Sequence, residues 1–141
     1  MKNIQDNFVP YKESVELKEL GFDKKCLASY YAESRKFPTD IKLHILNTDQ
    51  LGYNTIRSAD RGVIIAPLWQ QAFEFFREKY NLYIEIDWYK YEWYFVIYDF
   101  KNNLPPNKTS AHLLHREDKP YESYEEAQLE CLRELIKIVK K

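Results

Sequence analysis

Glycine and long apolar runs are scarce in this chain, and each absence excludes a class of protein. Three glycines are too few for phosphate-binding loops, which need several glycines close together. No apolar run approaches the ~18 residues of a membrane-spanning helix, and residues 1–6 lack the apolar stretch of a signal peptide. These absences predict a cytoplasmic protein without membrane association.

Cysteine is equally scarce. Cys26 and Cys131 lie far apart and form no C-x-x-C pair, which favours two reduced thiols. Cys26 follows Lys24 and Lys25, whose charges could lower the pKa of its thiol, but a thiol buried in a strand is the interpretation we prefer. Cys131 falls on the core face of the last predicted helix. A nucleophilic site would need a partner from the three histidines, His44, His112 and His115.

An excess of charge of one sign is also missing. The chain has 21 Lys and Arg against 22 Asp and Glu, for a net charge of −1. Non-specific nucleic-acid binding depends on neutralising several phosphates, so this balance does not favour it. A basic cluster could still assemble in three dimensions from Lys24, Lys25, Arg35, Lys36 and Lys42.

Aromatic residues, at 16% of the chain, are abundant. They concentrate in residues 66–100, where a helix beginning at Pro67 is followed by two aromatic strands. Residues 82–89 alternate apolar and polar, as in a half-buried strand. Residues 93–98 are apolar on both faces, which indicates a central strand. A turn near Lys90 and Tyr91 separates the two strands.

The remaining elements complete one domain over residues 1–141. We expect a first helix over residues 10–20 with Gly21 as its left-handed cap, strands near 26–31 and 42–46, and a short strand at 63–65. Residues 101–121 are expected to be irregular. Ser123 and Glu126 predict a capping box at the start of the last helix. The expected fold is α+β, with three helices on a mainly antiparallel sheet of about four strands in the order α-β-β-α-β-β-α.

Several blocks of the chain resemble a family of small proteins from Bacteroides-type bacteria and their phages or integrated elements. The blocks are residues 8–11, 17–23 with Cys26, 66–73, 76–80, 124–127, and 131–132 with 135–136. They cover about half of the chain and consist mostly of core and capping residues. The family has no established activity, so the resemblance implies a phage or mobile-element accessory protein and assigns no catalytic residue.

Patterns typical of catalysis or metal binding are weak. His112 and His115, with Glu117 and Asp118 behind them, have metal-ligand residue types, but a helical zinc protease site needs histidines at i and i+4. The carboxylate pairs have structural explanations at strand surfaces or helix starts. We therefore predict no metal, no cofactor and no enzymatic activity.

The aromatic strands carry the functional prediction. Their tyrosines could form a stacking platform for nucleic-acid bases, but such platforms interleave basic residues, and these strands carry carboxylates instead. The function we favour is a non-enzymatic accessory protein acting through protein–protein contacts or self-association, including a homodimer. The alternative is a nucleic-acid-associated protein. The candidate interface consists of Leu68, Phe75, Tyr94, Tyr98, Leu129 and Ile136.

Overall fold

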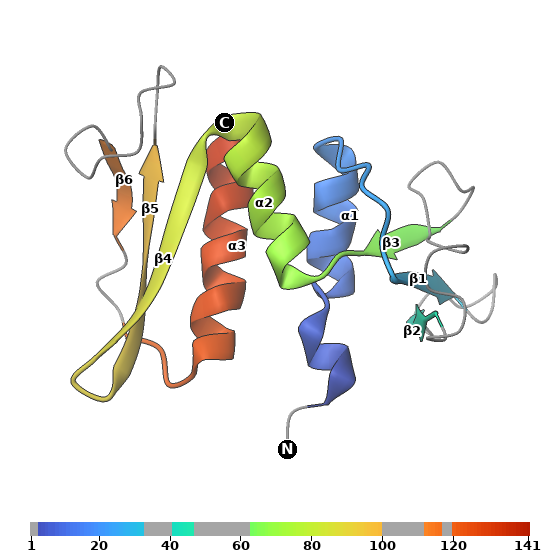
Figure 1. The fold of residues 1–141 in the computed structure, drawn as a ribbon, viewed down its shortest axis with the longest axis horizontal. Coiled ribbons are helices and arrows are strands. Elements are labelled where there is room, and N and C mark those ends of the chain that lie inside the picture. The colour runs from blue at the N-terminus through green and yellow to red at the C-terminus, as the bar shows by residue number, and fades with distance from the viewer. Residues whose placement is uncertain (1–2, 33–40, 47–62, 100–111, 117–119) are drawn as a thin grey trace. The chain divides into compact units, whose positions relative to one another are not determined.

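A computed structural model describes residues 3–32, 41–46, 63–99, 112–116 and 120–141 of the chain. Within these ranges the protein is α+β, with three α-helices and two three-stranded antiparallel sheets (Figure 1). The chain divides into two compact units, residues 1–72 and 73–141. The division falls inside a helix, and each unit is described by itself.

The first unit holds a short 3-10 helix, one α-helix and one sheet. The elements are η1 (Ile4–Asn7), α1 (Tyr11–Glu19), β1 (Ala28–Ala32), β2 (Ile41–Ile45) and β3 (Ile64–Ala66). β1 is the central strand, with Tyr30 opposite Leu43 of β2 and Ser29 opposite Ile65 of β3. Helix α1 packs against β3. The predicted first helix and the short strand near 63–65 are confirmed.

Gly21 ends α1 as predicted. Its φ of 94° lies in the left-handed region that favours glycine. The Gly21 amide donates to the Lys18 carbonyl at 3.0 Å and the Phe22 amide to the Leu17 carbonyl at 3.0 Å, the two bonds of a Schellman cap. Leu17 and Phe22 are both buried, so the cap turns the chain back into the core.

The carbonyl of Val9 anchors α1 to the sheet. It accepts hydrogen bonds from the Tyr30 hydroxyl at 2.7 Å and from the Ser14 hydroxyl at 3.1 Å. Burial raises the pKa of Tyr30 to about 12, and the charge of Glu13 adds to the shift. Tyr30 therefore keeps its proton, and its hydrogen bond, throughout the neutral range.

Helix α2 (Trp69–Tyr80) begins later than predicted and contains the boundary between the units. Pro67 was expected in the first turn, but it lies before the helix. The Leu68 amide instead donates to the Gln71 side chain at 3.0 Å, which satisfies an amide that the helix leaves unpaired. Asn81 directly follows the helix with a φ of 55°, a conformation that asparagine tolerates because its short side chain can form local hydrogen bonds.

The second unit holds the other sheet and the last helix. β4 (Leu82–Tyr89), β5 (Glu92–Asp99) and β6 (His112–Arg116) lie side by side in that order, and α3 (Tyr124–Lys140) packs against β5 and β4 (Figure 1). As predicted, β5 is central. Ser123 caps α3 by accepting from the Glu126 amide at 3.1 Å. The Glu126 carboxylate accepts from the Glu122 amide at 3.2 Å, one residue before the Ser123 amide that the predicted capping box would use.

Two parts of the predicted architecture are corrected. The described chain has six strands in two sheets rather than about four in one. The two additional strands are β3, which was predicted as a short strand outside the order of four, and β6, which lies within a segment expected to be irregular because of its prolines. β6 pairs with β5, with a register shift between Ile97 and Tyr98. Its residues lack the apolar alternation by which strands are recognised. The expectation of one domain over 1–141 stays a prediction.

Candidate functional site

The β4–β5 hairpin presents two chemically different faces. Cross-strand partners share a face, and successive residues alternate between faces. The inner face consists of Leu82, Ile84, Ile86 and Trp88 with their partners Asp99, Ile97, Phe95 and Trp93. The outer face consists of Tyr83, Glu85, Asp87 and Tyr89 with their partners Tyr98, Val96, Tyr94 and Glu92.

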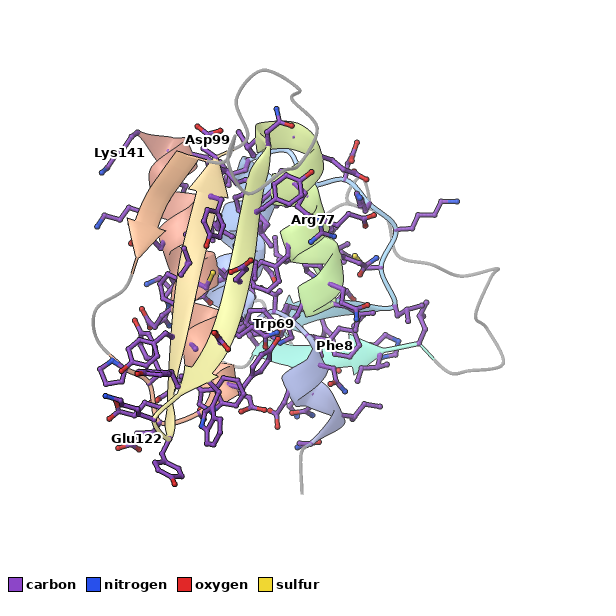
Figure 2. All side chains as sticks on the ribbon, turned by 60° about the vertical axis from the view of Figure 1, so that its left-hand side comes forward. Phe8, Trp69, Arg77, Asp99, Glu122 and Lys141 are labelled. Atoms are coloured by element: carbon purple, nitrogen blue, oxygen red, sulfur yellow. The ribbon has the colours of Figure 1, made fainter. Side chains whose placement is uncertain are left out.

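The inner face belongs to the core of the second unit. Phe95 and Ile97 are almost completely buried. The ring of Phe95 stacks on Tyr121, with centroids 5.9 Å apart, and Trp93 meets Tyr124 edge to face at 5.3 Å. These contacts tie the hairpin to the start of α3. Figure 2 shows Asp99 and Glu122 at opposite ends of the sheet, with side chains projecting from the strands between them.

The outer face combines carboxylates with tyrosine hydroxyls. Tyr94 donates to the Glu92 carboxylate at 3.0 Å, and Tyr98 donates to the Glu85 carboxylate at 3.4 Å. The hydrogen bond to Glu92 raises the pKa of Tyr94, with smaller contributions from burial and from the Glu92 charge. In both hydrogen bonds the tyrosine hydroxyl is the donor and the carboxylate, which can only accept when ionised, is the acceptor.

A hollow of about 440 Å³ opens on this part of the sheet. It is lined by Glu85, Asp87, Tyr89, Tyr94, Phe95 and Val96. Its volume lies within the range of about 300–1,000 Å³ typical of ligand sites. Small-molecule sites are mostly apolar, however, whereas this hollow places two exposed carboxylates beside aromatic rings. Its chemistry therefore suits a cationic group.

The hairpin tip, residues 88–91, carries strain and exposed aromatic surface. Lys90 and Tyr91 have φ of 49° and 68°, as a two-residue type I′ turn requires, although such turns favour Asn-Gly. A left-handed conformation costs a non-glycine residue about 1–2 kcal/mol. Trp88, Tyr89 and Tyr91 are 53%, 61% and 86% exposed. Trp88 and Tyr91 meet edge to face with centroids 5.6 Å apart.

The predicted interface residues are divided between the two units, with Leu68 in the first and the other five in the second. Tyr94 and Tyr98 lie on the outer face of the hairpin. Leu68 is partly buried and packs against Phe8, Ala28 and Ala66 in the first unit. Leu129, on α3, is also partly buried.

Phe75 and Ile136 are buried within the chain, at 6% and 3% exposed, and their place in an interface stays a prediction. The Phe75 ring meets Phe76 at 5.4 Å and Tyr80 at 5.9 Å, edge to face in both cases, and the Lys79 ammonium lies 5.4 Å from its centroid. Phe75 lies on α2 and Ile136 on α3, each at the edge of the wide apolar face that the helical spacing predicts. That spacing cannot show whether the edge of such a face meets solvent or the core.

The cysteines do not form an activated site. Both thiols are buried, as predicted for Cys26, although Cys26 lies two residues before β1 rather than within the strand. Burial raises the pKa of Cys26 to about 12, against the lowering that Lys24 and Lys25 could have caused. Its Sγ lies 3.5 Å from the Lys24 carbonyl oxygen. The pKa of Cys131 is raised as well, mainly by burial. A nucleophilic cysteine reacts as its thiolate, so both are poor nucleophiles at neutral pH.

The histidine and lysine clusters are described only in part. The backbone of His112 and His115 forms part of β6. Glu117 and Asp118 lie outside the described residues. His44 is exposed on β2 and contacts the Tyr31 ring edge to face, 6.3 Å away. No group of three or more potential metal ligands occurs in the part of the chain that the structure describes. Of the predicted basic cluster, Arg35 and Lys36 also lie outside the described residues.

Trp88 and the three outer-face carboxylates are the site residues that sequence reasoning did not select. Glu85 and Asp87 alternate with Ile84, Ile86 and Trp88 in the sequence, and this alternation predicted that they face outward. What the alternation lacked was the register with β5, which places Glu92 and Tyr94 next to them. The sequence therefore indicated which side chains of β4 face outward, but it did not indicate which residues of β5 lie beside them.

Comparison of the chain with protein-family models, curated proteins and solved structures gave no match. No helix among the described residues has the length and apolar character needed to cross a membrane.

Proposed function

We propose that this chain is a non-enzymatic accessory protein that binds another protein through the outer face and tip of the β4–β5 hairpin. The observation that carries the proposal is the tip, where three large aromatic side chains are exposed on a turn that two non-glycine residues hold at positive φ. Strained backbone persists where the surrounding structure enforces it, and it concentrates at functional sites. Exposed tyrosine and tryptophan are favoured contact residues, because they combine large apolar area with a polar group.

The chemistry of the outer face supports a protein partner over a nucleic acid. Glu85, Asp87 and Glu92 are exposed on it, and these carboxylates repel phosphate. The nucleic-acid alternative would depend on the basic cluster that includes Lys24, Lys25 and Lys42, and it stays a prediction. The role in phages or mobile elements implied by the resemblance is part of this proposal.

A co-purification experiment tests the proposed function. The immobilised chain is exposed to a lysate of its source organism, and retained proteins are quantified by mass spectrometry. We expect the double variant Tyr89→Ser/Tyr91→Ser to lose proteins that the unmodified chain retains. Tyr31→Ser is the matched control, because Tyr31 is also an exposed tyrosine, at 42%, but lies on β1. If all three baits retain the same set, the hairpin is not the binding surface.

A further inference from the structure

The outer face of the hairpin carries three carboxylates, and the basic residue beside it in the register of the sheet is Arg116 of β6, opposite Val96. Residues 82–99 contain a single basic residue, Lys90. No salt bridge joins Glu85, Asp87 or Glu92 to a basic residue in the described chain. The hydrogen bonds that these carboxylates accept come from tyrosine hydroxyls and from the Trp88 amide. Such bonds orient the carboxylates and leave their net charge in place.

The same region already holds a cation on an aromatic ring. The Lys90 ammonium lies 5.2 Å from the centroid of the Tyr89 ring, within the distance of about 6 Å at which a cation is attracted to a ring face. Tyr89 also lines the hollow together with Glu85, Asp87 and Tyr94. Rings and carboxylates together attract a cation in two ways, by the ring quadrupole and by charge.

A second copy of the chain does not fit this face. A two-fold contact places the same patch of each copy against the other. Here it would bring the carboxylates of one outer face against those of the other. Juxtaposed like charges across an interface disfavour the contact. The occupant that complements this face is therefore a different, cationic surface.

We propose that the outer face of the β4–β5 hairpin binds an arginine-rich segment of a partner protein, with guanidinium groups placed between the tyrosine rings and the carboxylates. Arginine fits better than lysine, because its planar guanidinium stacks on aromatic rings and bonds a carboxylate through two N–H groups. This inference depends on the proposed function and names the chemistry of its partner.

Fluorescence anisotropy with defined peptides tests the inference. The probe is a short fluorescein-labelled peptide in which arginine alternates with serine, at about 0.1 M salt, where exposed charges beyond about 10 Å are largely screened. We expect Glu85→Gln/Asp87→Asn to weaken binding about tenfold. Both substitutions preserve side-chain shape and the ability to accept a hydrogen bond.

The matched control also removes two negative charges, but from the helix that covers the other face of the sheet. Glu130→Gln/Glu134→Gln neutralises two carboxylates of α3, which packs on the inner face. These carboxylates pair with Arg133 and Lys137 on the helix surface, and such surface pairs contribute little to stability. We expect this variant to change peptide affinity less than about twofold. Thermal unfolding of both variants verifies that they fold alike.

The peptide chemistry separates arginine recognition from general attraction to positive charge. Replacing every arginine of the probe by lysine is expected to weaken binding about threefold. Equal losses in the two double variants, or equal affinity for the arginine and lysine peptides, would overturn the inference. If the arginine peptide fails to bind while Tyr89→Ser/Tyr91→Ser still loses lysate proteins, the proposed function stands and the partner is not arginine-rich.

Discussion

The two faces of the β4–β5 hairpin are built from the same strands, yet their environments are opposite. Phe95 and Ile97 on the inner face are 1% and 0% exposed, whereas Glu85, Asp87 and Glu92 on the outer face are exposed. Because neighbouring residues point to opposite faces, stability and recognition can be encoded by alternate positions of one strand. Phe95 and Tyr94 are therefore expected to differ in role as well as in burial.

The largest expected effect comes from comparing these two neighbours. Phe95→Ala should lower the free energy of unfolding by about 3–5 kcal/mol, because it leaves a cavity between the sheet and α3. Tyr94→Ala should lower it by about 1 kcal/mol or less, as for most surface substitutions. Urea denaturation measures both values. Similar losses in the two variants would remove the distinction between the faces.

A smaller effect is expected at the hairpin tip. Tyr91→Gly should raise the free energy of unfolding by about 1 kcal/mol, since glycine adopts positive φ without steric cost. The same variant should weaken partner binding, because it removes a side chain that is 86% exposed. Thermal unfolding and co-purification measure the two properties. A less stable variant would show that Tyr91 serves the fold rather than binding.

The smallest effect is a change in one titration. The pKa of Tyr94 is raised by its hydrogen bond to Glu92, so the neutral phenol is favoured in the folded chain. This contribution is complete below the ordinary tyrosine pKa of about 10 and disappears as the pH rises through the raised value. Glu92→Gln should lower the pKa of Tyr94 toward its ordinary value. NMR of the labelled ζ-carbon follows the titration.

The control for this titration is Glu85→Gln, which changes another carboxylate of the same face. Its side chain accepts from Tyr98 rather than from Tyr94, so the pKa of Tyr94 should stay raised in this variant. Equal shifts in both variants would mean that the total charge of the face, rather than the hydrogen bond to Glu92, sets the pKa of Tyr94.

Local features of the fold could be predicted because their causes are local. The Gly21 cap, the Ser123 cap and the alternation in β4 each depend on residues a few positions apart. The number of sheets and strand β6 could not be predicted in this way. They depend on pairing between strands separated by long segments, and periodicity within one strand does not encode its partner.

The candidate site was predicted only in part, for the same reason. Tyr94 and Tyr98 could be selected because both lie in a conspicuously aromatic strand. The burial of Phe75 and Ile136 could not be predicted from the sequence, because burial at the edge of a helix face depends on tertiary packing. The juxtaposition of Glu92 and Tyr94 with Asp87 and Tyr89 required the register of the hairpin.

NMR of the aromatic rings tests most directly whether the peptide binds the outer face of the hairpin, because rings on both faces are observed in one experiment. The aromatic ring signals of the chain are recorded by NMR while the alternating arginine–serine peptide is added. We expect the ring signals of Tyr89, Tyr94 and Tyr98 to shift with peptide concentration, while the ring signal of Phe95 does not change. Shifts confined to rings outside the hairpin, or no shift in any ring, would contradict the claim that the outer face is the binding surface.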